Sequence, residues 1–167
     1  MNSVNQRAVT LKDIPFIMNE FELGAKSGNF SKEFLTPQKN KNLEKQLRDM
    51  IKLSDSGSFT GHFFYILTNT SDEKRYGFIW LMVARGPNDQ SVLEIRAINI
   101  KKDQRGKGLA TLMLDEWLNA YPHHPFQAKC FAKSSQMIEM LHRRGFKTLN
   151  TAASGNKFLF RDANIII

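Results

Sequence analysis

The spacing of hydrophobic residues changes several times along the chain, and each change marks a predicted element. Apolar residues recur at intervals of three and four between residues 14 and 21, and again between residues 43 and 51. This spacing predicts two amphipathic helices. A short strand over residues 7–10 is expected before the first helix, and a polar connection over residues 24–37 is expected to join the two.

Three strands are predicted in the middle of the chain, over residues 63–67, 76–83 and 92–100. Aromatic and β-branched residues dominate the first strand. The second is almost continuously apolar, as is typical of a strand buried on both faces. The polar residues 69–75 and the sequence Gly-Pro-Asn-Asp at 86–89 predict the connecting turns.

Helices and strands alternate in the last third of the chain. Helical spacing resumes at Leu109, and two prolines are expected to end that helix near residue 120. A second helix is predicted to begin at Ser134 or Ser135 and to end at Gly145, because glycine favours the left-handed backbone of a helix C-terminus. Short strands are predicted over residues 126–131, 146–149 and 157–160.

The predicted order is therefore β-α-α-β-β-β-α-β-α-β-β, without repeats, low-complexity tracts or linkers. A chain of 167 residues has the length of one domain with a full hydrophobic core. Its 41% hydrophobic and 24% charged residues are ordinary for a globular domain. We expect a single domain that spans residues 1–167.

Composition excludes several classes of protein. No apolar run approaches the ~20 residues that cross a membrane, and residues 1–13 lack the apolar core of an export signal. The single cysteine, Cys130, excludes an internal disulfide framework and is typical of a reducing compartment, so a cytoplasmic protein is expected. The four histidines and Cys130 lack metal-ligand spacing, and we expect no metal.

The net charge of +8 is concentrated in two segments. Residues 96–107 hold five Lys or Arg and one acid, and residues 128–167 hold seven and two, which leaves the rest of the chain near neutral. This clustering favours one polyanionic ligand over a basic surface for nucleic acid. An RNA-bearing substrate stays open on charge alone.

A basic turn with two glycines, residues 104–111, follows the third predicted strand. Its sequence is Gln-Arg-Gly-Lys-Gly-Leu-Ala-Thr. Glycines let backbone N–H groups approach an anion closely, and the start of a helix adds free donors and the positive end of a dipole. Lys101, Lys102, Arg105 and Lys107 add full charges. This glycine turn therefore predicts a phosphate-binding site.

Two widespread phosphate motifs do not match the glycine turn. A dinucleotide-binding turn needs a third glycine, where Thr111 stands, and an acid about twenty residues further on. A P-loop needs Gly-Lys followed by Ser or Thr. An isolated Arg-Gly-Lys-Gly is also compatible with an ordinary tight turn, so the surrounding sequence has to decide.

The longer pattern Arg105-x-x-Gly108-x-Ala110 after a buried strand resembles the pyrophosphate-binding motif of the Gcn5-related N-acetyltransferase (GNAT) superfamily. Residues 7–14 are similar to the opening strand and helix of that family, and residues 141–146 resemble its closing helix and Gly-Phe pair. The resemblance covers nearly the whole chain. It implies an α+β fold with a mixed, mostly antiparallel central sheet of about seven strands flanked by about four helices.

The resemblance also implies an activity, the transfer of an acetyl group from acetyl-CoA to an amine by direct attack in a ternary complex. The end of the third strand would offer backbone groups to the pantetheine arm, and the glycine turn would bind the pyrophosphate. Ser134 stands where the family often has a hydrogen-bonding asparagine. The residues expected to bind the cofactor are Ile98, Asn99, Ile100, Arg105, Gly106, Lys107, Gly108, Leu109, Ala110, Thr111 and Ser134.

Glu94 is the expected catalytic base, because the reaction needs a neutral amine and therefore a group that removes a proton. It lies six residues before Ile100, a position where the histone-acetyltransferase branch of the family carries a glutamate in that role. The alternative is a structural ion pair with Arg96, which is two residues further on and on the same face of the strand.

The usual general acid of the family is absent from this sequence. A tyrosine commonly lies four residues before the glycine of the Gly-Phe pair, and here that position holds Leu141. His142 is adjacent but projects about 100° away around the helix, which predicts a surface residue. Cys130, Tyr65 and Tyr76 also carry a proton that a general acid could donate, but their positions in the sequence do not match that of the family's acid.

Other functions stay open beside the N-acetyltransferase. Leu141 suggests a non-catalytic acyl-CoA-binding or sensing module, and the charge of +8 suggests an RNA-directed acetyltransferase. The resemblance implies that the acceptor, a small molecule or a protein amine, is bound largely by residues 21–53 and by the late strands, and residues 21–53 match no acceptor signature. The Ile165-Ile166-Ile167 tail either extends the last strand or packs against the second subunit of a homodimer.

Overall fold

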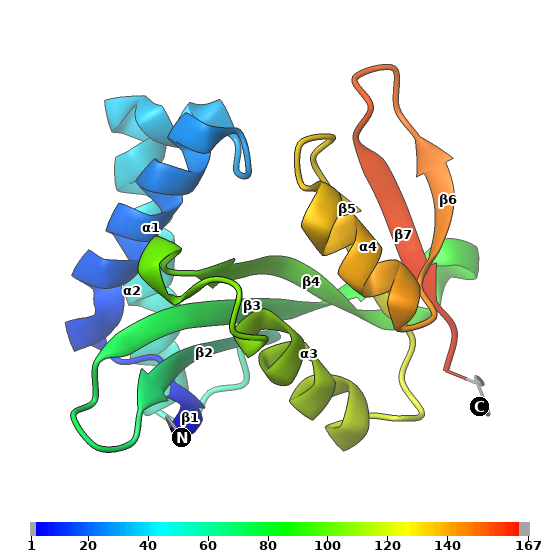
Figure 1. The fold of residues 1–167 in the computed structure, drawn as a ribbon. Coiled ribbons are helices and arrows are strands. Elements are labelled where there is room, and N and C mark those ends of the chain that lie inside the picture. Colours follow the sequence, from blue (N-terminus) through cyan, green and yellow to red (C-terminus); the bar gives the residue numbers. More distant parts are fainter. Residues whose placement is uncertain (1–2, 164–167) are drawn as a thin grey trace.

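The computed structural model describes residues 3–163 as a seven-stranded sheet with helices on both faces (Figure 1). The strands are β1 (Val4–Ala8), β2 (His62–Asn69), β3 (Arg75–Arg85), β4 (Ser91–Ile100), β5 (Phe126–Cys130), β6 (Lys147–Thr151) and β7 (Lys157–Arg161). The helices are α1 (Ile14–Ser27), α2 (Pro37–Asp55), α3 (Leu109–Ala120) and α4 (Ser135–Arg143). Short 3₁₀ turns are η1 (Leu11–Asp13), η2 (Lys32–Leu35), η3 (Pro87–Asp89) and η4 (Lys102–Gln104).

The order of strands in the sheet is β1-β2-β3-β4-β5-β7-β6. Neighbouring strands are antiparallel except β4 and β5, which are parallel because the crossover through α3 lies between them. This mixed, mostly antiparallel sheet confirms the predicted fold class.

Two hydrophobic cores lie on the two faces of the sheet. On one face, α1 and α2 pack Phe21 and Leu47 against Phe78 of β3. On the other face, α3 and α4 pack Met113 and Leu141 against the strands. Because β3 contributes to both cores, its sequence is apolar at almost every position, as predicted.

The N-terminal third differs most from the sequence prediction. β1 spans Val4–Ala8 rather than residues 7–10, and α1 continues to Ser27, through part of the connection predicted over residues 24–37. Gly24 does not end the helix. A Cβ at Gly24 would overlap the ring of Phe30, so this glycine lets the segment after α1 fold back against the helix. The end of α1 is Gly28, whose φ of 85° is left-handed.

The pairing between β4 and β5 is short. Residues 93–95 of β4 pair with residues 126–128 of β5, and beyond them only the pairing of β5 with β7 continues. The pairing of β4 with β3 shifts register at the same point, which makes Arg96 the extra residue of a β-bulge. Residues 96–100 of β4 therefore have an unpaired side toward β5, called here the open edge of β4.

Within residues 3–163, no helix has both the length and the apolar character that a membrane span requires. The Ile165-Ile166-Ile167 tail lies outside the described residues, so its two predicted roles stay predictions.

Candidate functional site

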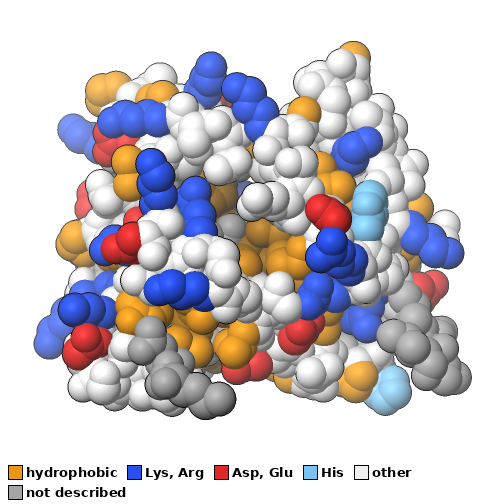
Figure 2. Space-filling view, in the orientation of Figure 1, with side chains coloured by type: hydrophobic (Ala, Val, Ile, Leu, Met, Phe, Trp, Pro, Cys, Tyr) orange, Lys and Arg blue, Asp and Glu red, His pale blue; other side chains and the backbone are white. Residues whose placement is uncertain are grey.

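A pocket of about 1140 Å³ lies over the point where β4 and β5 separate. Its walls come from the open edge of β4, the glycine turn, the start of α3, the end of β5, α4, and the loop after α1. Figure 2 shows it as a hollow in the middle of this face, with hydrophobic side chains at its floor and Lys and Arg side chains around it. Its size and mixed lining are those of a small-molecule site.

The pocket brings together most of the residues predicted to bind the cofactor. Lys107 is the exception, because it does not line the pocket and its Nζ donates to Gln104 Oε1 at 3.0 Å. The predicted cofactor residues that do line it are Ile98, Asn99, Ile100, Arg105, Gly106, Gly108, Leu109, Ala110, Thr111 and Ser134.

The glycine turn presents unpaired backbone donors to this pocket. Gly106 and Gly108 have φ of 77° and 75°, and a Cβ at either would meet nothing within 4 Å. Within residues 3–163, no backbone acceptor pairs with the N–H groups of residues 106–111, and the first such bond of α3 runs from Leu112 N to Gly108 O at 3.0 Å. The N–H groups of residues 108–111 at the start of α3, and those of residues 106 and 107 just before it, therefore lack a backbone partner and can bind an anion.

Arg105 has a structural contact as well as a place in the pocket. Its Nε donates to the carbonyl oxygen of Ile100 at 2.8 Å, which ties the glycine turn to the end of β4. The cationic guanidinium also lines the pocket, where it adds positive potential.

The open edge of β4 offers backbone groups to the pocket while its side chains point to the two faces of the sheet. Ile98 and Ile100 are buried in the core beneath α3 and α4. Asn99, between them, points to the opposite face, where its Nδ2 donates to Glu20 of α1. The predicted pantetheine site is thus a strand edge with unpaired backbone groups, held in place by the buried side chains of Ile98 and Ile100.

Glu94 lies where β4 and β5 are still paired, two residues before the β-bulge at Arg96. Its side chain is 9% exposed and does not line the pocket. Oε1 accepts a hydrogen bond from Gln127 Nε2 at 2.9 Å, and Oε2 lies 3.6 Å from Arg96 NH1. The predicted ion pair with Arg96 is present, and it leaves the catalytic role of Glu94 a prediction.

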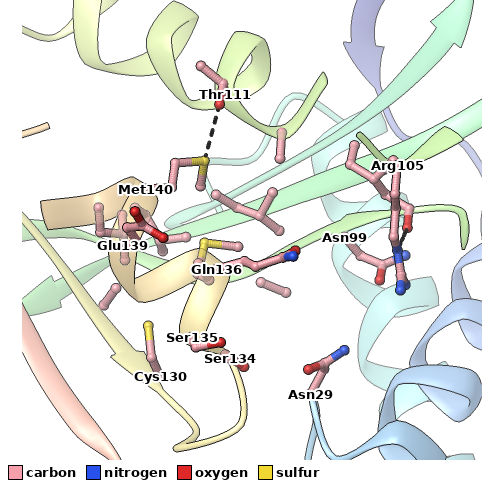
Figure 3. A pocket seen from close by; sticks show the side chains of 18 of the residues that line it. Asn29, Asn99, Arg105, Thr111, Cys130, Ser134, Ser135, Gln136, Glu139 and Met140 are labelled. Atoms are coloured by element: carbon pink, nitrogen blue, oxygen red, sulfur yellow. Dashed lines mark hydrogen bonds between the residues drawn. The ribbon is translucent and has the colours of Figure 1, made fainter. Parts of the chain in front are cut away.

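The groups considered as general acids occupy different places. Leu141 is fully buried and lines the pocket, whereas His142 is exposed, as predicted, and lies 2.9 Å from Thr148 Oγ1. Cys130 also lines the pocket, and burial raises the pKa of its thiol to about 11. Tyr65 and Tyr76 do not line it. In Figure 3, Cys130 lies beside Ser134 and Ser135 at the end of β5.

Sequence reasoning missed the wall that closes the pocket opposite α4. Asn29 and Phe30 come from the loop after α1, which was predicted only as a polar connection. Phe30 packs against Phe21 with ring centroids 4.8 Å apart. The Gly24 and Gly28 pair was the available signal, but the contact between Gly24 and Phe30 is apparent only in three dimensions.

Among the described residues, no group of three or more His, Cys, Asp or Glu side chains is arranged to hold a metal ion.

Comparisons with known proteins match the whole architecture but not the sequence. No protein-family model matches the chain, and a search of curated proteins finds no match. The PaiA N-acetyltransferase of Thermoplasma acidophilum, solved in complex with coenzyme A, superposes with a TM-score of 0.71 at 17% identity, covering 96% of this chain and 99% of that one.

Two further solved structures show the same relationship. The spermidine N-acetyltransferase of Vibrio cholerae, in complex with CoA and spermine, gives a TM-score of 0.63 at 13% identity, covering 94% of this chain and 92% of that one. A protein of Desulfovibrio desulfuricans assigned to the GNAT family gives 0.64 at 17% identity, covering 95% and 96%. The chain therefore has the fold of the GNAT acetyltransferases.

Proposed function

We propose that this protein is an acetyl-CoA-dependent N-acetyltransferase that acts on a primary amine by direct attack in a ternary complex. The observation that carries the proposal is one pocket in which the open edge of β4 meets the free N–H groups of residues 106–111. Solved proteins of the same fold are described as complexes with coenzyme A. With a single cysteine in the sequence, we also propose a reducing compartment such as the cytoplasm.

Each part of acetyl-CoA has a matching surface in the pocket. The pyrophosphate would accept hydrogen bonds from the N–H groups at the start of α3, with Arg105 adding charge. The pantetheine arm would pair with the open edge of β4 as an additional strand would. Ser134 at the start of α4 would add a hydroxyl from the other wall.

The chemistry needs a base and a donor for the developing oxyanion. Glu94 would take the proton of the amine, through water in the opening between β4 and β5, since its carboxylate lies just outside the pocket. Unpaired N–H groups on the open edge of β4 would stabilise the thioester oxygen as negative charge develops. The thiolate of CoA would leave without a protein acid, because Leu141 carries no proton to donate.

Thermal unfolding with and without acetyl-CoA tests the cofactor proposal. Acetyl-CoA at about a hundred times its dissociation constant should add roughly 2.7 kcal/mol of stability. No change in melting temperature at millimolar acetyl-CoA would contradict the proposal. Release of free thiol in the presence of a mixed panel of amines then tests the transfer itself.

A second candidate, a non-catalytic acyl-CoA-binding module, is favoured by Leu141, which is 0% exposed at the position expected for an acid. This module would show the same thermal stabilisation by acetyl-CoA and would release no thiol with any amine. The two measurements together therefore separate binding from transfer.

A further inference from the structure

Strand β5 buries a side-chain amide beside the candidate base. Gln127 lies between the buried residues Phe126 and Ala128 and is itself 3% exposed. It does not line the large pocket. Apolar residues usually fill such a position, because burying a polar group costs free energy unless its hydrogen bonds are made. The hydrogen bonds of this amide therefore show what it does.

The NH₂ group of Gln127 has two acceptors. Nε2 donates to Oε1 of Glu94 at 2.9 Å and, at 3.4 Å, to the carbonyl oxygen of Arg85 at the end of β3. An ionised carboxylate and a carbonyl can only accept hydrogen bonds, so both require the NH₂ side of the amide. The orientation of the Gln127 side chain is thereby fixed.

The oxygen of the same amide has no hydrogen-bond partner. Oε1 of Gln127 is fully enclosed, and no residue of the described chain, 3–163, donates a hydrogen bond to it. The turn after β3 closes over this oxygen at Gly86, where a Cβ would overlap Val92 and lie 3.3 Å from Oε1. An enclosed acceptor without a donor destabilises the fold. The bond from Nε2 to Glu94 is therefore the contact that explains a glutamine at this position.

The second oxygen of Glu94 lies beside a residue of the pocket wall. Oε2 is 3.6 Å from NH1 of Arg96, which lines the pocket and whose guanidinium carbon lies 5.4 Å from the ring centroid of Trp80. That distance to NH1 is longer than a hydrogen bond, so Oε2 keeps a free lone pair. Among the Lys, Arg and His side chains that the structure describes, only Arg96 lies within 4 Å of the Glu94 carboxylate.

The two oxygens of Glu94 thus have different surroundings. Oε1 accepts a hydrogen bond from a buried donor of fixed orientation, and Oε2 lies on the side of the pocket wall. A donor to one oxygen fixes the plane of the carboxylate and favours its ionised form. A general base needs both properties, because it must be ionised and must keep one oxygen within reach of the proton.

We propose that Gln127 is a positioning residue for Glu94, whose Oε1 it holds so that Oε2 takes the proton of the amine. The nitrogen of the neutral amine bonds to the thioester carbon, and the C–S bond breaks with its electron pair on the CoA thiolate. The proton that the nitrogen loses passes through water to Oε2, and Glu94 later releases it to solvent. This inference rests on the proposed function, because it needs Glu94 as the base.

The test measures kcat against pH in wild type, Gln127→Met, Glu94→Gln and the double variant. Thiol release from acetyl-CoA is followed with spermidine, lysine methyl ester, kanamycin and triglycine amide as acceptors. Methionine nearly matches glutamine in length but donates no hydrogen bond. We expect Gln127→Met to lower kcat at pH 7 at least about tenfold and to move the acidic limb of the profile upward by about one pH unit, because the ionised carboxylate loses a donor. In the Glu94→Gln background the same substitution should change kcat less than about twofold, because Gln127 acts through Glu94.

Two further variants exclude a merely structural role. Asn69 is a matched control, since it is a buried side-chain amide of the same sheet that donates to Tyr76 Oη at 2.8 Å and does not line the pocket. Asn69→Leu should lower the melting temperature and leave the kcat–pH profile at that of wild type. Gln127→Asn keeps an amide on a shorter side chain, guards against misfolding of Gln127→Met, and should move the profile in the same direction.

The outcomes separate this inference from the proposed function. A wild type that binds no CoA in isothermal titration, or that releases no thiol with any amine, would overturn the proposed function and the role of Gln127 with it. With transfer by wild type intact, a wild-type profile in Gln127→Met, or an equal loss of kcat in the presence and absence of Glu94, would overturn the positioning role alone. A wild-type kcat in Glu94→Gln would do the same, since no base would be left for Gln127 to position.

Discussion

The chain passes from strand into helix at two junctions that are built in opposite ways. Between β1 and α1, the Asp13 carboxylate accepts hydrogen bonds from Arg7, Arg75 and the Thr10 N–H at 2.7–2.9 Å. Between β4 and α3, the N–H groups of residues 106–111 have no backbone acceptor within the described chain. At the first junction the protein's own carboxylate accepts the hydrogen bonds, whereas at the second the N–H groups have no such partner, and the proposed function assigns them to CoA.

The same physical property of helices underlies both junctions. A helix N-terminus carries unpaired donors and partial positive charge, so it is stabilised by a negative group. At the start of η1, directly before α1, the protein supplies that group itself, as the buried Asp13 carboxylate that accepts from the Thr10 N–H. At α3 the sequence has glycine and cations instead, and under the proposed function the pyrophosphate of CoA supplies the negative charge. The difference teaches that an incomplete helix N-terminus beside a pocket indicates binding, whereas a complete one indicates stability.

The largest expected effect is on kcat in a variant of Glu94, and it separates catalysis from CoA binding at the β4–α3 junction. If Glu94 removes the amine proton, Glu94→Gln should lower kcat by about a hundredfold or more, while the affinity for acetyl-CoA changes little. Stopped assays of thiol release and isothermal titration with CoA measure the two quantities. A wild-type kcat that is level from pH 6 to pH 9 would remove Glu94 from the mechanism.

The next largest effect is on the free energy of unfolding, and it tests the contribution of Asp13 at the junction between β1 and α1. Burial raises the pKa of Asp13, but the hydrogen bonds from Arg7, Thr10 and Arg75 outweigh it and lower the pKa from 3.8 to about 2. A lowered pKa stabilises the fold above pH 4, and that contribution is lost as the pH falls toward 2. Asp13→Asn should therefore lower the free energy of unfolding at pH 7 by about 2 kcal/mol, and by much less at pH 2.

Urea unfolding at the two pH values measures this difference. Asp103→Asn is the control at the other junction, because Asp103 is 62% exposed and its nearest cation, Lys101, is 3.6 Å away. Its substitution should change the free energy of unfolding by less than about 0.5 kcal/mol. An equal loss in both variants would mean that the two junctions do not differ in stability.

A smaller effect tests the open junction directly. Gly108→Val places a branched side chain over the free N–H groups and should weaken CoA binding at least about tenfold, or 1.4 kcal/mol. Gly57→Val is the matched control, since Gly57 has a φ of 83° and equally open space but does not line the pocket. Both variants should lose similar stability from the positive φ. Equal CoA affinities in the two variants would refute the anion site.

The smallest effect concerns Lys107, which the sequence placed in the cofactor site. Its ammonium pairs with Gln104 and does not line the pocket. Lys107→Ala should therefore change CoA affinity less than about twofold at 0.15 M salt, because an exposed charge is screened. If the Lys107 side chain turns toward the phosphates of bound CoA, isothermal titration would show a larger loss of CoA affinity in Lys107→Ala.

The sequence predicted most of the architecture because the information was local. The almost continuous apolar run of β3, the helical spacing in α3 and Gly145 at the end of α4 each depend on neighbours along the chain. The predicted ends of helices and strands were wrong where contacts with residues distant in the sequence determine them. Gly24 stands inside α1 because it must pass close to Phe30, a contact that no periodicity reports.

The candidate site divides in the same way. The sequence by itself determined the glycine turn, because positive φ, free N–H groups and clustered cations are properties of one continuous segment. Only the tertiary structure decided where β4 and β5 separate, that Glu94 meets Gln127, and that Glu20 and Asn99 lie together although they are far apart in sequence. The reason is physical: backbone conformation follows local residue type, whereas the charge balance of a buried side chain depends on which distant strand or helix packs against it.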